Sequence, residues 1–236
     1  MNPKIIIPQE LLLDIRSCSD GLEYCYGIAR FDEGLIQVLS LRPHDDLKKV
    51  ARINSRGIEL EGYPYSIPFK EMETIPVSDE FISRSQGVID TSIVAARKVA
   101  FIGLGSVGSQ ISLHLTQSAV GRFILLDPDE FSASNLARHV CDIRDLGRYK
   151  TKAVRDMILR RNPQAAIQTF EENLLDLSWH EQMERLRGSD LVIATTDSTA
   201  AQFMVNELCH SLQIPSLYVG CYERACAGEI LFVKPG

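Results

Sequence analysis

Hydrophobic and polar residues follow two different patterns along the chain. In the first third, short apolar runs alternate with Gly and Pro, as in KIIIP at 4–8 and YPYSIPF at 63–69. The stretch GIARFDEGLIQVLSL at 27–41 is typical of two strands around an Asp-Glu-Gly turn. We therefore expect residues 1–75 to form a small α+β or mostly β module, and the more polar residues 76–98 to form a helical connector.

From residue 99 the pattern changes to an alternation of strands and helices. Within 106–118, for example, Val107, Ile111 and Leu115 recur on one helical face. The predicted strands are 98–103, 122–127, 165–171, 190–197, 216–220 and 228–236, and the predicted helices are 106–118, 150–162, 178–188 and 199–212. This alternation predicts an α/β fold with a Rossmann-like, mostly parallel sheet and helices on both faces.

Composition and charge narrow the class of protein. The 236 residues suffice for one large domain or two small ones. The net charge is −6 and no Lys/Arg run forms a stripe, which makes nucleic acid an unlikely partner. No apolar stretch approaches the roughly 18 residues of a membrane span, so we expect no membrane association. The six cysteines form no CxxC pair, which favours a cytoplasmic chain with reduced thiols and no zinc ribbon.

A glycine-rich turn follows the first strand of the α/β region. In FIGLGSVGSQ at 101–110, Gly103 permits a tight turn, Gly105 lets the backbone approach a phosphate, and Gly108 lets the following helix pack on the strand. Asp127 ends the second strand, 24 positions after Gly103, where an acid typically binds ribose hydroxyls. The pattern predicts a nucleotide site but does not separate NAD from ATP.

Residues after the second strand favour ATP. Arg138 and Lys150 provide two cations for phosphate charge, which an NAD enzyme does not need. Asn135 is a candidate hydrogen-bonding partner of the nucleotide, and Asp197 ends a later strand with a carboxylate that suits Mg²⁺. Asp129 is either an indirect contributor to the site or a helix cap. We expect His139 and Cys141 to serve packing or the surface rather than chemistry. We expect Cys221 and Cys226 to serve packing rather than a thiolate role.

The motifs GxGxxG, DxDxxxxSNLxR, GxxK and TxD occur in order, within a match from about 82 to about 232. This series resembles the ThiF/MoeB/ubiquitin-activating superfamily, and in particular prokaryotic ThiF-type adenylyltransferases. The resemblance implies ATP-dependent adenylation of the C-terminal glycine of a ubiquitin-like protein. It also implies that Asp127 binds ribose and Asp197 serves magnesium. The residues it assigns to the rest of the nucleotide are Gly103, Gly105, Ser106, Gly108, Asp129, Asn135, Arg138 and Lys150.

The stretch ISRSQG at 82–87 is similar to the RYxRQ motif of the same family. In bacterial homodimers of the family, the matching arginine reaches the ATP of the neighbouring subunit. The resemblance therefore implies that Arg84 is a further catalytic residue and that the chain forms a homodimer. A solvated helix arginine is the alternative interpretation of Arg84.

The chain departs from the family pattern in the glycine turn and after its last strand. Ser106 stands where many relatives have a third glycine. Beyond the strand at 228–236, relatives carry a crossover segment and often a CxxC pair or thioester cysteine. We therefore expect residues 99–236 to be a C-terminally incomplete adenylation domain, or one that passes its product to a conjugating or sulfur-transfer protein without a thioester.

The N-terminal module resembles the start of JAB-type deubiquitinase domains. The metal signature of that family is absent, since His44 is the only histidine before residue 100. We expect an accessory module for partner binding or dimerisation, or a degraded JAB-like domain.

Other functions remain open alongside protein adenylation. The acceptor can be a peptide, a small molecule or a tRNA base. A non-catalytic subunit that scaffolds an activating complex is a second class of function, although such subunits lose the Arg, Lys and Asp that are present here. An NAD dehydrogenase is the third alternative.

Overall fold

The computed structural model describes residues 90–162, 164–222 and 226–236 throughout, and eight strands of the chain before them. The chain divides into two compact units, Met1–Arg84 and Ser85–Gly236. The predicted connector at 76–98 lies largely outside the described residues, and its described part contains the short helix α3 (Thr91–Ala96).

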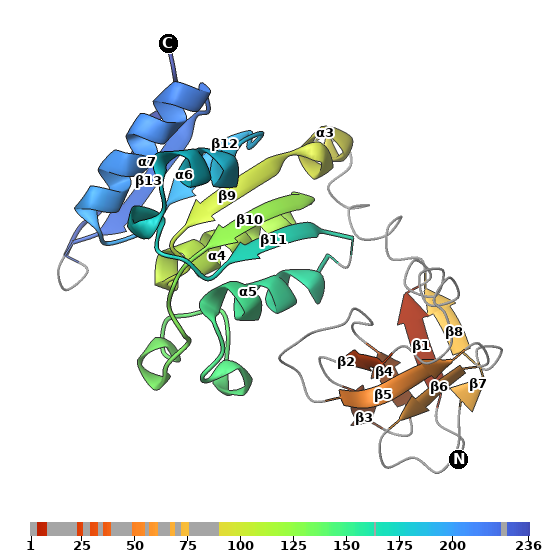
Figure 1. The fold of residues 1–236 in the computed structure, drawn as a ribbon. Helices are drawn as coiled ribbons and strands as arrows, with labels where there is room; N and C mark the ends of the chain where they lie inside the picture. The colour runs from red at the N-terminus through yellow and green to blue at the C-terminus, as the bar shows by residue number, and fades with distance from the viewer. Residues whose placement is uncertain are drawn as a thin grey trace. The chain divides into compact units, whose positions relative to one another are not determined.

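The first unit contains two four-stranded sheets (Figure 1). Their strand orders are β3-β4-β1-β8 and β2-β5-β6-β7. The strands are β1 (Lys4–Pro8), β2 (Glu23–Cys25), β3 (Ala29–Asp32), β4 (Leu35–Val38), β5 (Lys49–Asn54), β6 (Gly57–Leu60), β7 (Ile67–Pro68) and β8 (Met72–Ile75). The two strands predicted within 27–41 are found as the antiparallel pair β3 and β4, in which Asp32 pairs with Leu35.

The second unit alternates strands and helices as the sequence predicts. Its strands are β9 (Lys98–Ile102), β10 (Arg122–Leu126), β11 (Ala166–Phe170), β12 (Leu191–Ala194), β13 (Ser216–Cys221) and β14 (Gly228–Val233). Its longer helices are α4 (Ser106–Gln117), α5 (Lys150–Leu159), α6 (Trp179–Leu186) and α7 (Thr199–Leu212). Three 3₁₀ helices that the periodicity did not predict are η3 (Ala133–Asn135), η4 (Ile143–Asp145) and η5 (Leu174–Asp176).

The six strands form one sheet in the order β11-β10-β9-β12-β13-β14. All neighbouring pairs are parallel except β13 and β14, which are antiparallel. The chain runs outward from β9 through β10 to β11, then returns to β12 on the other side of β9. This reversal creates a switch point between β9 and β12, where open α/β sheets bind their ligands. The predicted α/β, Rossmann-like fold is confirmed.

Helices cover both faces of this sheet because alternate strand residues point in opposite directions. Val99 and Phe101 of β9 belong to one buried cluster, together with residues of α5. Ala100 and Ile102 belong to a second cluster, together with residues of α6 and α7. Burial on both faces accounts for the continuous apolar run of β9. Among the described residues, no helix combines the length and the apolar character needed to cross a bilayer.

The most deeply buried face of α4 differs from the predicted one. Val107, Ile111 and Leu115 are only half-buried, whereas Ser112 and Thr116 are fully buried. The hydroxyl of Ser112 donates to the carbonyl of Ser109, and the hydroxyl of Thr116 donates to the carbonyl of Ser112. Because these hydroxyls are satisfied within the helix, small polar side chains can face the sheet without an unpaired polar group.

Candidate active site

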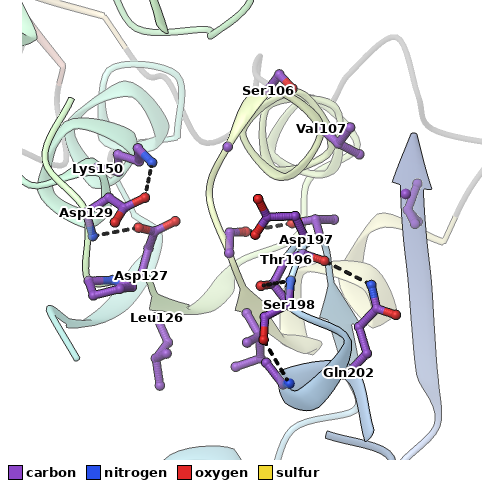
Figure 2. Close-up of a pocket in the computed structure, with 18 of the residues that line it drawn as sticks. Ser106, Val107, Leu126, Asp127, Asp129, Lys150, Thr196, Asp197, Ser198 and Gln202 are labelled. Carbon is purple, nitrogen blue, oxygen red and sulfur yellow. Dashed lines mark hydrogen bonds and ion pairs between the residues drawn. The ribbon is translucent and has the colours of Figure 1, made fainter. Parts of the chain in front are cut away.

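An open pocket of about 1130 Å³ lies at the carboxyl ends of the central strands, at the switch point of the sheet. Figure 2 shows Asp127, Asp129 and Lys150 on one side of the glycine-rich turn and Thr196, Asp197 and Gln202 on the other. The predicted site residues that line the pocket are Gly103, Gly105, Ser106, Asp127, Asp129, Asn135, Arg138, Lys150 and Asp197. The motifs are therefore brought together, although they span almost a hundred positions of sequence.

The three glycines of the turn serve different steric needs. Gly103 has φ of +92°, and a Cβ there would lie 3.0 Å from the backbone nitrogen of Thr196. A Cβ on Gly108 would lie 2.4 Å from the carbonyl oxygen of Gly103, so Gly108 serves helix packing and does not line the pocket. A Cβ on Gly105 would meet no atom within 4 Å. Gly105 thus keeps open the space at the start of α4, where free N–H groups favour an anion.

Asp127 joins the glycine turn to the loop after β10. One carboxylate oxygen accepts from the backbone N–H of Leu104 at 2.6 Å, and the other accepts from the N–H of Asp129 at 2.8 Å. The side chain is 4% exposed, and burial raises its pKa above the ordinary value, opposed by the Leu104 N–H and the charge of Lys150. Asp127 therefore organises the turn, whatever ligand the turn holds.

Lys150 is the first residue of α5 and is held beside Asp129. Its Nζ donates to Asp129 Oδ2 at 2.6 Å, and its backbone N–H donates to the carbonyl of Asp129 at 2.9 Å. Glu130 and Tyr149 form an antiparallel bridge next to this contact. The Lys150 side chain is 10% exposed, whereas that of Asp129 is 64% exposed. Lys150 thus reaches the pocket edge from a buried stem, and Asp129 holds its ammonium group there.

Buried ion pairs brace the segment that carries Lys150. The Arg148 guanidinium bonds the carboxylates of Asp145 and Asp156, both of which are 3% exposed. The Arg148 carbonyl also accepts from the N–H of Phe131 at 2.7 Å. These contacts, together with the bond from the N–H of Gly147 to the carbonyl of Phe131, fix the 147–150 segment against residues 129–131.

Three further pocket residues make fewer contacts with other side chains, namely Asn135, Arg138 and Asp197. Asn135 Oδ1 accepts from the backbone N–H of Ser132 at 2.9 Å, which closes a capping box around η3. Arg138 and Asp197 are exposed side chains on the pocket wall. Asp197 lies between β12 and Ser198, the N-cap of α7. An exposed guanidinium and carboxylate in one pocket are available to a ligand.

The structure adds pocket residues that the motifs did not identify. Thr196 lines the wall, and Gln202 donates to the Thr196 carbonyl at 2.9 Å. Tyr222 and Glu229, at the β13–β14 end, line the wall and bond each other at 2.9 Å. No motif identifies these two residues. Only their position in the chain could have done so, because β13 runs parallel to β12 and therefore ends at the same edge of the sheet as the pocket. Arg84 lies outside the described residues.

Cysteines near the pocket correct one expectation. Cys221 and Cys226 were expected to pack inside the protein, but both are exposed, and Cys221 lines the pocket. Cys221 is the last residue of β13, and Cys226 lies in the connection between β13 and β14. Cys141 and His139 are buried, in agreement with a packing role.

The pocket chemistry fits a nucleoside triphosphate and a magnesium ion. Gly105 leaves room for phosphate at a helix N-terminus, and Lys150 and Arg138 supply two cations. Asp197 supplies an oxygen ligand of the kind magnesium prefers. Fold and site together define a Rossmann-like α/β protein with a pocket that suits a nucleotide.

Comparison with known proteins identifies the family. The model of the ThiF family matches residues 80–236, and the chain belongs to this family. Ubiquitin-like modifier-activating enzyme 5 of Xenopus laevis is 26% identical over 86% of this chain and 54% of its own length. The same enzyme of Culex quinquefasciatus is 30% identical over 61% of this chain and 38% of its own length. The chain thus spans about half or less of these relatives.

Solved structures show the same fold. E. coli MccB, crystallised with ATP, superimposes with a TM-score of 0.55 and 23% identity over 62% of this chain and 43% of MccB. E. coli MccB with MccA-N7isoASN gives a TM-score of 0.59 and 22% identity over 67% of this chain and 48% of MccB. PaaA gives a TM-score of 0.53 and 25% identity over 61% of this chain and 47% of PaaA.

Proposed function

We propose that this chain uses ATP to adenylate the C-terminal glycine carboxylate of a ubiquitin-like protein. A carboxylate oxygen attacks the α-phosphorus of ATP, the bond between the α-phosphorus and its bridging oxygen breaks, and pyrophosphate leaves. The product is an acyl-adenylate. The observation that carries the proposal is the convergence of Lys150, Arg138 and Asp197 on the pocket that contains the glycine turn.

The residues of the chain supply binding and charge stabilisation rather than a nucleophile. The Gly105 N–H and the start of α4 hold phosphate oxygens, while Lys150 and Arg138 offset the negative charge that develops during attack. Asn135 contacts the nucleotide, and Asp127 meets the ribose while it holds the turn. Magnesium, held by Asp197, would neutralise phosphate charge.

The acceptor is proposed from the relatives. The curated relatives are named as ubiquitin-like modifier-activating enzymes, which supports a ubiquitin-like protein with a C-terminal glycine. MccB was crystallised with MccA, so a peptide is the alternative acceptor. A conjugating or sulfur-transfer protein would consume the adenylate. We further propose a cytoplasmic homodimer.

The test is ATP–pyrophosphate exchange in the presence of Mg²⁺ and a ubiquitin-like protein that ends in Gly-Gly. Lys150→Ala and Asp197→Ala should each lower the exchange rate by on the order of 10²-fold or more, because each removes a group that handles phosphate charge. Lys234→Ala and Asp176→Ala are charge-matched controls, since both residues are exposed and lie outside the pocket lining. The controls should retain the wild-type rate.

Three outcomes separate the alternatives. Full exchange by Lys150→Ala and Asp197→Ala would contradict the proposed site. Tight ATP binding without exchange, for every acceptor tried, would favour a scaffold subunit. Binding of NADH in place of ATP would favour the NAD dehydrogenase alternative.

A further inference from the structure

Two side chains hold the peptide groups on either side of Leu104, which lies between Gly103 and Gly105. The Leu104 N–H donates to Asp127, as described above, and the Leu104 carbonyl lies 2.8 Å from His139 Nε2. Leu104 is fully buried and His139 is 8% exposed, so neither bond competes directly with bulk water. His139 lies beyond η3, at a distance of 35 positions from Leu104.

The hydrogen bonds of His139 define its tautomer. Nδ1 accepts from the backbone N–H of Cys141 at 3.1 Å, so Nδ1 carries no proton. Nε2 therefore carries the proton of the neutral ring and donates to the Leu104 carbonyl. The edge of the ring packs against Phe131, with centroids 4.9 Å apart. The imidazole is thus fixed in orientation by two backbone partners and one aromatic neighbour.

The bond to Leu104 also orients Gly105. In a trans peptide the carbonyl and the following N–H point in opposite directions. Because the Leu104 carbonyl points to the buried His139 ring, the N–H of Gly105 points away from it, and Gly105 lines the pocket. The preceding peptide is held in the same manner, since the Gly103 carbonyl accepts from Thr195 Oγ1 at 2.7 Å. Side chains from three separate segments therefore set both peptides of the turn.

We propose that His139 is a positioning residue for phosphate binding, which as the neutral Nε2–H tautomer holds the Gly105 N–H toward the phosphates of the nucleotide. This inference rests on the proposed binding of ATP to the pocket. His139 touches neither nucleotide nor acceptor, and acts through the Leu104–Gly105 peptide. Protonation would place a hydrogen on Nδ1 facing the Cys141 N–H, and the ring would have to leave its position.

The surroundings of His139 favour the neutral form. Burial lowers the pKa of His139 below its ordinary 6.5, the bond to the Leu104 carbonyl opposes this, and the nearby charges of Lys150 and Asp145 act in opposite directions. The turn should therefore keep its arrangement at neutral pH and lose it only as the pH falls below the ordinary histidine range.

The experiment compares ATP and adenosine dissociation constants of the wild type, His139→Phe and His139→Gln by calorimetry. Phenylalanine keeps the ring but removes the donor, so ATP should bind about 10-fold or more weakly, the cost of leaving a buried carbonyl unpaired. Glutamine keeps an N–H donor and should bind ATP within about threefold of wild type. Adenosine, which lacks phosphates, should bind all three proteins alike, a pattern that general damage to the fold would not produce.

A pH series gives a second readout that does not need the phenylalanine variant to fold. The ratio of wild-type to His139→Gln affinity for ATP should fall as the pH drops below 6.5, because glutamine does not titrate and the titration of ATP cancels in the ratio. Equal ATP affinities of the folded variants, or parallel pH profiles, would overturn the inference. Failure of the wild type to bind ATP would instead remove the proposed function, and this inference with it.

Discussion

Single residues in this site have two kinds of role, and the sequence predicts only one of them. The charged residues Arg138, Lys150 and Asp197 were predicted from their places after the strands and from the family resemblance of the motifs. All three line one pocket. His139 and Thr195 were missed as contributors to the turn because their partners are backbone carbonyls, which leave no signature in side-chain patterns. The sequence therefore predicts the side chains that face a ligand. It predicts less well the side chains that hold the backbone of the binding turn in place.

The four thiols in the described part of the chain fall into two classes, which leads to a prediction about Cys221. Burial raises the pKa of Cys141 and of Cys209 to about 12, so neither forms a reactive thiolate near neutral pH. Cys221 and Cys226 are exposed, but only Cys221 lines the pocket. Iodoacetamide should label Cys221 and Cys226 in the native protein, and ATP with Mg²⁺ should slow the labelling of Cys221 alone.

Peptide mass spectrometry with isotope-coded reagent measures the rate at each thiol. Cys226 is the internal control, since it lies five positions away in the β13–β14 connection and does not line the pocket. Equal protection of both thiols would point to a global change on binding. Unchanged labelling of Cys221 by saturating ATP would contradict the assignment of the nucleotide to this pocket.

At the scale of elements, periodicity predicted every strand and long helix of the second unit. On α4 it identified Ile111 and Leu115, which pack against the core, but not the most deeply buried positions. Apolar spacing identified Val107, Ile111 and Leu115, whereas Ser112 and Thr116 occupy the buried positions. A hydrophobicity pattern does not identify a buried face made of serine and threonine, whose hydroxyls donate hydrogen bonds to carbonyls of the same helix. The 3₁₀ helices were missed for a related reason, because elements of three residues are too short to show a period.

The start of α4 offers a matched pair of substitutions. Gly108→Ala should lower the free energy of unfolding by about 1–3 kcal/mol, because the new Cβ would lie 2.4 Å from the Gly103 carbonyl oxygen. Gly105→Ala meets open space and should leave thermal stability near wild type, while it weakens ATP binding by on the order of tenfold or more. Thermal unfolding and ATP titration of both variants test the pair. Destabilisation by Gly105→Ala with intact ATP binding would contradict the proposed phosphate position.

At the scale of the whole molecule, the α/β unit followed from the order of its motifs. Strand and helix alternation predicts a parallel sheet, and a nucleotide turn after the first strand predicts a switch point beside it. The antiparallel pairing of β14 was not predicted, although the short connection after β13 is a signal for it, because a parallel crossover needs a dozen or more residues. The motifs lie almost entirely in the second unit and therefore carry no information about the first. The role of the first unit stays a prediction.

The last prediction concerns assembly. Arg84 is the final residue of the first unit, and its proposed role is to act on the ATP of a second copy of the chain. In an isologous dimer each subunit would then lend its Arg84 to the partner's pocket. Arg84→Ala and Asp197→Ala should each be inactive alone. When the two are mixed, about a quarter of wild-type activity should return, because half of the dimers are mixed and each has one complete site.

A second mixture makes the test specific. Lys150 and Asp197 line the same pocket, so dimers of Lys150→Ala with Asp197→Ala contain no complete site and should stay inactive. Subunit exchange is followed by native mass spectrometry of the two mixtures. If exchange occurs and Arg84→Ala still recovers no activity with Asp197→Ala, Arg84 does not act in trans. A monomer at the assay concentration, measured by light scattering alongside full activity, would contradict the shared site, because one chain would then supply every group that adenylation requires.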